Sequence, residues 1–169
     1  MISKATPNDI PALNNLVNSA YRGDSSRKGW TTEADLLDGT RTDEKTITDF
    51  FEDPNSTILK YVDAEQLLGC VRLVNRGGHL YLGMFAVDPV QQAKGIGKKL
   101  LVAAEEVALK QNCKSIDMTV ISVRAELIAW YKRHGYVETG EKKPMVFDSP
   151  AGGAPKKELY FITLEKNLA

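Results

Sequence analysis

Apolar residues recur along the chain with two different periods, and each period predicts one kind of secondary structure. Spacings of three and four residues predict helices at residues 8–20, 46–53, 91–112 and 124–135. Short runs rich in β-branched and aromatic residues predict strands at residues 1–5, 56–63, 66–75, 79–89, 113–122, 136–142 and 157–167. The resulting order, β-α-α-β-β-β-α-β-α-β-β, is typical of an α/β or α+β fold with mixed layers.

Glycine and proline residues mark where several of these elements begin, end or bend. Pro11 is tolerated best in a first helical turn, so it favours a helix that starts at Asn8. Gly135 is suited to cap the end of the last helix. Gly83 lies inside a strand, where glycine often marks a bulge or a close backbone approach. No repeat or linker divides the chain, so residues 1–169 are expected to form one domain.

Composition narrows the class of protein. The chain has 169 residues, and its 22 basic and 22 acidic side chains give a formal net charge of zero. This balance argues against a protein that binds nucleic acid or membrane through bulk charge. Cys70 and Cys113 lie far apart without metal-ligand spacing, so we interpret them as buried thiols and expect no metal. The sequence shows neither a signal peptide nor an apolar run of about 18 residues, so we expect a cytoplasmic protein.

The stretch QAKGIG, residues 92–97, suggests a loop that holds phosphate. It does not fit a Walker A loop, because Lys99 stands where Ser or Thr is needed. It fits a dinucleotide-binding loop poorly, because Leu100 replaces the third glycine. It does match [QR]-x-x-G-x-[GA], in which small residues admit a pyrophosphate to the N–H groups and positive dipole end of a helix. A plain glycine turn with solvated lysines is the alternative.

Three stretches occur together: FAVDP at residues 85–89, QAKGIG, and YKRHGY at residues 131–136. With them the chain resembles the GNAT superfamily of N-acetyltransferases over nearly its whole length. The resemblance implies a mostly antiparallel, twisted mixed sheet of about seven strands flanked by about four helices. It implies a bulge near Gly83 or Met84, and a neighbouring strand, 113–122, that splays away to open a slot.

The resemblance also implies acetyl-CoA as the acetyl donor. The FAV backbone would lie along the pantetheine arm, and the glycine loop would surround the phosphates. The cofactor-binding residues carried over in this way are Phe85, Ala86, Val87, Gln92, Ala93, Lys94, Gly95, Ile96, Gly97, Lys98 and Lys99.

Acetyl transfer to an amine needs a neutral amine, a donor for the developing oxyanion and a proton for the departing thiolate. By resemblance Tyr131 supplies that proton as the catalytic acid, and it also contacts the cofactor; the alternative is a core tyrosine on a helix face. Many members of the superfamily have Asn seven residues earlier, where this chain has Arg124. An arginine there would pair with a cofactor phosphate or a substrate carboxylate.

The sequence leaves the general base open. His79 begins a long strand beside a turn, where a surface role is the alternative. Glu33, Asp35 and Glu44 belong to a polar segment, and each also fits a solvated or capping carboxylate. Glu138 follows the HGY stretch and is interpreted as structural. A water chain to a backbone carbonyl would serve as well.

Residues 21–45 and 142–156 are long, polar or Pro/Gly-rich segments, and we expect them to shape the acceptor site. The first carries Trp30, Glu33 and Arg41, and basic groups beside an aromatic ring suit a carboxylated or phosphorylated molecule. We therefore expect a small-molecule amine, amino-acid-like or another metabolite, as the acceptor. Acetylation of a protein N-terminus or lysine, a non-catalytic acyl-CoA sensor and a ligand-free interaction protein are the alternatives. Homodimers are common in the resembling superfamily, but no residue decides the oligomeric state.

Overall fold

The computed structural model describes residues 1–21, 37–38, 42–91, 94–144, 154–155 and 160–168. Seven strands form one sheet in the order β1-β3-β4-β5-β6-β9-β7, and two short strands form a separate ladder. The strands of the large sheet are β1 (Ile2–Lys4), β3 (Ser56–Asp63), β4 (Gln66–Asn75), β5 (His79–Val87), β6 (Ser115–Ile121), β9 (Tyr160–Asn167) and β7 (Val137–Pro144). The strands of the ladder are β2 (Leu37–Asp38) and β8 (Ala154–Pro155).

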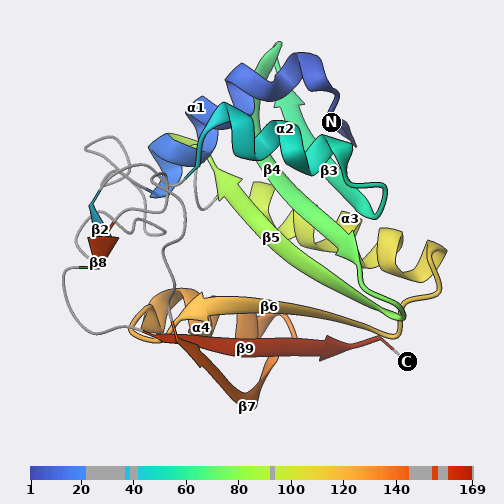
Figure 1. The fold of residues 1–169 in the computed structure, drawn as a ribbon, viewed down its shortest axis with the longest axis vertical. Helices are drawn as coiled ribbons and strands as arrows, with labels where there is room; N and C mark the ends of the chain where they lie inside the picture. Colours follow the sequence, from blue (N-terminus) through green and yellow to red (C-terminus); the bar gives the residue numbers. More distant parts are fainter. Residues whose placement is uncertain (22–36, 39–41, 92–93, 145–153, 156–159, 169) are drawn as a thin grey trace.

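Helices cover both faces of the large sheet (Figure 1). Within the described ranges the α-helices are α1 (Ile10–Tyr21), α2 (Glu44–Glu52), α3 (Ile96–Lys110) and α4 (Ala125–Arg133), with 3-10 turns η1 (Pro7–Asp9) and η3 (Pro89–Gln91). Apolar residues of α1 and α2 share one core cluster with Ile58, Cys70 and Ala86 of the sheet. Residues of α3 and α4 share the other cluster with the opposite face. The mixed-layer fold and mostly antiparallel sheet expected from the sequence are therefore confirmed.

The predicted elements lie where the apolar spacing placed them, but two helices begin later than expected. The Thr6 backbone N–H donates to the Asp9 carboxylate at 2.8 Å and fixes a 3-10 turn, so α1 begins at Ile10 instead of Asn8. The helix predicted from residue 91 begins at Ile96, because Gly95 has a left-handed φ of 84° and is the N-cap residue. Strands β2 and β8 were not predicted, because two residues are too few to show a period.

A bulge in β5 lies where the sequence predicted it. Cys70 of β4 pairs with Ala86, whereas Arg72 pairs with Gly83, so β5 contains one residue more than β4 across this interval. Met84 occupies the interval with a φ of 45°, an uncommon backbone conformation for a residue with a side chain. The bulge bends β5 just before the FAV stretch.

The parallel pairing of β5 with β6 stops early. It joins His79, Leu80 and Tyr81 to residues 115–117, and no β6 residue pairs with β5 beyond that point. All other pairs in the large sheet are antiparallel, and β6 continues along β9 to Ile121. In Figure 1 β5 and β6 diverge from a common end, which confirms the expected splay.

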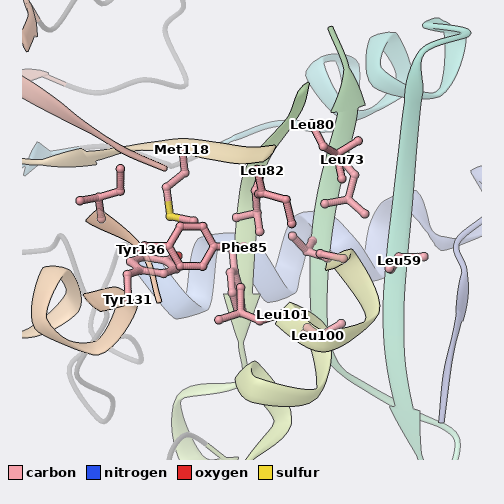
Figure 2. Close-up of a cluster of buried hydrophobic side chains, with 14 of the residues drawn as sticks. Leu59, Leu73, Leu80, Leu82, Phe85, Leu100, Leu101, Met118, Tyr131 and Tyr136 are labelled. Carbon is pink, nitrogen blue, oxygen red and sulfur yellow. The ribbon is translucent and has the colours of Figure 1, made fainter. Parts of the chain in front are cut away.

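The larger core cluster lies between the sheet and the α3/α4 layer. Figure 2 shows Leu100 and Leu101 of α3 facing Leu73 and Leu82 of the sheet, and Tyr131 and Tyr136 closing the same cluster at the α4 end. These side chains are at most 5% exposed. None of the described helices is both long and apolar enough to cross a membrane.

Gly135 ends α4 as the sequence predicted. It has a φ of 98°, and a Cβ placed on it would lie 3.0 Å from Cε of Lys166. That side chain forms an ion pair with Glu105 of α3. The turn after α4 is therefore packed beneath a contact between α3 and β9.

We predict that Gly135→Ala lowers the free energy of unfolding by more than the roughly 1–2 kcal/mol that a left-handed backbone costs a residue with a side chain. The extra loss comes from displacing Lys166. Gly140→Ala is the matched control, because Gly140 has a φ of 90° and nothing within 4 Å of the added Cβ. Urea unfolding of both variants measures the difference. Equal losses would show that Lys166 accommodates the methyl group without cost.

Candidate active site

The open end of the splayed strands brings together residues that are far apart in the sequence. Phe85, Ala86 and Val87 end β5 and are buried. The Asp88 backbone N–H donates to the Leu68 carbonyl at 2.8 Å, which keeps the strand paired with β4 as it leaves the sheet. The η3 turn follows and leads toward α3. The predicted pantetheine strand and the predicted phosphate loop therefore meet at one end of the slot.

The N-terminus of α3 has the geometry of an anion site. Gly95 is its N-cap residue with a φ of 84°, and no side chain caps it. The first intrahelical bond runs from the Lys99 N–H to the Gly95 carbonyl at 3.1 Å, so earlier N–H groups have no acceptor within the helix. Lys94, Lys98 and Lys99 are exposed or half-exposed around this turn, whereas Gln92 and Ala93 lie outside the described residues. The turn suits a phosphate group.

Four aromatic rings connect α4 to this turn. Tyr131 lies with its ring centroid 6.2 Å from that of Phe85, 5.2 Å from that of Trp130 and 5.8 Å from that of Tyr136. A Cβ on Gly97 would lie 3.4 Å from the Trp130 ring and 3.5 Å from Phe85. Because residue 97 has no side chain, the Trp130 indole lies directly against the first turn of α3.

Trp130 is a site residue that the sequence reasoning missed. Its indole is half-buried between Gly97 and the Tyr131 ring. The centroid of the indole ring lies 4.3 Å from that of the His134 ring, and the two rings are tilted to each other. Nδ1 of His134 lies 2.7 Å from the Trp130 carbonyl oxygen. Because a carbonyl only accepts, Nδ1 carries the proton. The available signal was a large aromatic residue directly before Tyr131.

Arg124 lies where the chain enters α4. It is 8% exposed and is the N-cap residue of the helix, with its backbone N–H donating to Ile121 at the end of β6. The backbone of Arg124 therefore lies at the end of β6, whereas Phe85 lies in β5. The predicted contact of Arg124 with cofactor or substrate stays a prediction.

The described candidate bases lie at three different places in the fold. His79 lies at the closed end of the splay, 3.7 Å from the Asp117 carboxylate. Glu138 forms an ion pair with Lys132 at 2.7 Å, which agrees with its structural interpretation. Glu44 lies in the first turn of α2 and is exposed. The remaining acceptor-site candidates, Trp30, Glu33, Asp35 and Arg41, lie outside the described residues.

The two segments expected to shape the acceptor site are joined to each other. Strand β2 belongs to the first segment and β8 to the second, and they pair antiparallel through Leu37 with Pro155 and Asp38 with Ala154. Two hydrogen bonds join the end of the first segment to α1. The Asn18 side-chain amide donates to the Thr42 carbonyl at 3.0 Å and accepts from the Thr42 backbone N–H at 2.9 Å. One short ladder thus joins two segments that are separated by over a hundred residues.

Comparison with known proteins places the chain in a family. A model of the acetyltransferase (GNAT) family matches residues 11–136. The chain is 34% identical over 68 residues to the spermine/spermidine N(1)-acetyltransferase of Bacillus subtilis, covering 40% of this chain and 45% of that protein. It is 39% identical over 64 residues to the S-(2-succino)cysteine N-acetyltransferase of the same organism, covering 37% and 39%. Both matches span less than half of the relative.

Similarity in structure extends over the whole fold. The ribosomal-protein-alanine N-acetyltransferase of Brucella melitensis superposes with a TM-score of 0.74 over 99% of both chains, at 21% sequence identity. At that identity the likeness shows the fold alone. Because the family model matches most of the sequence, this chain belongs to the GNAT family of N-acetyltransferases, enzymes that use acetyl-CoA as the acetyl donor.

Tyr136 carries a pH-dependent contribution to stability. Its side chain is 2% exposed, and its hydroxyl has no hydrogen-bond partner in the described part of the chain. Burial, and after it the Glu105 carboxylate, raises the pKa of this phenol above its ordinary value of 10.0. The folded state therefore resists ionisation of Tyr136 more than the unfolded chain does.

We predict that Tyr136→Phe keeps or raises the free energy of unfolding at neutral pH, because an unsatisfied buried hydroxyl is removed. A raised folded-state pKa means that stability is present below the unfolded pKa and is lost as pH rises past about 10. The variant should lose less stability over that alkaline range. Urea unfolding against pH tests this, with Tyr160→Phe as control because that ring is 39% exposed. Equal alkaline slopes in wild type and Tyr136→Phe would contradict the assignment.

Proposed function

We propose that this enzyme moves the acetyl group of acetyl-CoA directly to the primary amine of a small, amino-acid-like metabolite. One observation carries the proposal: the end of β5, the N-terminus of α3 and Tyr131 of α4 converge at the mouth of the β5–β6 slot. The sequence relatives that acetylate spermine, spermidine or S-(2-succino)cysteine support a small amine, although they match less than half of their length. The β2–β8 ladder also suits an enclosed pocket better than an open groove for a protein chain.

The described residues fit the cofactor. We propose that Phe85, Ala86 and Val87 contact the pantetheine arm through their backbone. The phosphates would meet the first-turn N–H groups of α3 together with Lys94, Lys98 and Lys99. The space around Gly95 supports this, because no atom of the described residues lies within 4 Å of a Cβ placed on it. When bound, acetyl-CoA supplies the thioester that the amine attacks.

We assign the proton that the leaving thiolate needs to the Tyr131 hydroxyl. Tyr131 is 5% exposed and its ring is fixed by Phe85, Trp130 and Tyr136, so the hydroxyl is held with little freedom. As the amine forms the C–N bond and the C–S bond breaks, the amine would release one proton to water, the departing sulfur would take one from Tyr131, and the tyrosinate would regain a proton from solvent. A free amine has a pKa of about 10.4, so the incoming amine must be deprotonated first. A backbone N–H of the bulged segment is the donor we propose for the oxyanion.

The proposal is tested first by calorimetric titration with acetyl-CoA. We expect micromolar binding by the wild type and loss of binding in Gly97→Trp, because the indole would block the first turn of α3. Leu109→Trp is the matched control, because it adds the same side chain to an exposed position near the other end of α3. Equal affinity in both variants would show that the glycine loop does not hold the cofactor. Thermal unfolding of each variant separates lost binding from lost folding.

Tyr131→Phe tests the chemistry separately from binding. We predict unchanged acetyl-CoA affinity and a kcat lowered roughly 10²-fold, the usual scale for an acid–base group. Steady-state kinetics with the best acceptor amine measure this. Wild-type turnover in Tyr131→Phe would remove this residue from the mechanism.

A further inference from the structure

The face of β4 and β5 that lies under α2 carries a cluster of polar and aromatic groups with no role so far. Arg72 of β4 lies directly opposite Gly83 of β5 in the register. Its guanidinium stacks on Phe50 of α2 at 3.8 Å, so the cluster faces the α1/α2 layer. Paired residues in antiparallel strands share a face, and so do alternate residues of one strand. Tyr81 therefore projects on the same side as Arg72.

Gly83 determines where the Tyr81 hydroxyl lies. A Cβ on Gly83 would lie 2.8 Å from Cε2 of Tyr81 and 3.2 Å from its hydroxyl oxygen. The phenol ring is therefore folded along β5, over the glycine and toward the bulge at Met84. Arg76 stacks on this ring with Cζ 4.2 Å from its centroid. The hydroxyl thus lies over the Arg72–Gly83 pair, on the opposite face of β5 from the Phe85 ring and one residue before the bulge.

Two of the three nitrogen atoms of the Arg72 guanidinium contact polar side chains. Nε donates to Ser56 Oγ at 3.0 Å, and Nη2 lies 3.5 Å from the Asp53 carboxylate. Among the described residues no hydrogen bond reaches Nη1 of Arg72 or the Tyr81 hydroxyl. The Arg72 guanidinium and the Tyr81 phenol lie on one face of the sheet, and a guanidinium N–H and a phenol O–H can donate together to a carboxylate.

We propose that Arg72 and Tyr81 bind the carboxylate of the acceptor, so that the enzyme acetylates amino acids in preference to polyamines. The inference rests on the proposed function above. Two residues of an extended strand span about 6–7 Å, so an amino acid whose carboxylate lies over Gly83 reaches Phe85, where the slot opens, with an amine on its side chain and not with its α-amine. A polyamine lacks the carboxylate that Arg72 and Tyr81 would bind, so it gains nothing from these two donors.

The test compares acceptors that differ only in charge. Common L-amino acids, their α-carboxamides and spermidine are supplied with acetyl-CoA, and kcat/KM is measured for each. We expect the wild type to favour the acids over the carboxamides and over spermidine. Tyr81→Phe should lower kcat/KM for the acids about tenfold, mainly through KM, because one hydrogen bond to a charged group is lost. Its effect on the carboxamides should be smaller.

Three further variants sharpen the test. Gly83→Ala leaves every polar group in place but displaces the Tyr81 ring, so it should reproduce Tyr81→Phe. Asp53→Asn removes the carboxylate that competes for Arg72, so it should raise the preference for acids. Tyr160→Phe is the matched control, because Lys142 lies 5.1 Å above that ring on another part of the sheet, and it should leave the preference unchanged. Unaltered preference in both Tyr81→Phe and Gly83→Ala would overturn the proposal.

A binding measurement separates this inference from the proposed function. Amino acids and their carboxamides are titrated calorimetrically into the enzyme saturated with CoA. Tighter binding of the acids, weakened in Tyr81→Phe, supports the carboxylate site even if no acceptor is acetylated, an outcome that would overturn only the proposed function. Turnover of carboxamides or spermidine at least as fast as of acids, together with equal binding, would overturn the carboxylate site and leave the acetyltransferase function standing.

Discussion

The early end of the β5–β6 pairing is the constraint on which the candidate site depends. Pairing stops after Tyr81, and three residues later the bulge at Met84 bends β5 away from its neighbour. Backbone groups on the facing edges of a sheet need hydrogen-bond partners. A ligand with amide groups, such as a pantetheine arm, is suited to that gap. Everything else proposed for this enzyme lies around the opening that these two backbone features create.

Two kinds of contact hold the opening in shape. On the α3/α4 side, Phe85, Trp130 and Tyr131 pack edge to face, and such ring pairs contribute about 0.5–1.5 kcal/mol each beyond their buried area. On the α1/α2 side, Arg72 ties β4 to α2 through Phe50 and Asp53. The aromatic side is suited to an acyl-CoA, and the charged side to an acceptor. The bulged strand lies between them, so both proposed substrates would reach one segment of backbone.

The sequence predicted the fold well because its signals are local. The apolar stripe from Ile96 to Ala108 defines α3, the glycine at position 135 ends α4, and glycine at position 83 marked the bulge. The starts of α1 and α3 were less well predicted, because a 3-10 turn replaces the first turn before α1 and the left-handed Gly95 starts α3, and neither changes the apolar spacing. The proposed cofactor loop could be suggested for a similar reason: its residues are contiguous, and a glycine before a helix is a local feature of phosphate sites.

By itself the sequence determined the element order, the bulge position, the glycine loop and the tyrosine that lies beside it. Only the tertiary structure decided which distant residues share a face. In the folded protein His79 lies at the paired end of β5 and β6, and Trp130 lies beside the first turn of α3. The Tyr81 ring lies over Gly83, on the same face as Arg72. Strand register and side-chain direction set these contacts, and both depend on pairings between segments that no local pattern encodes.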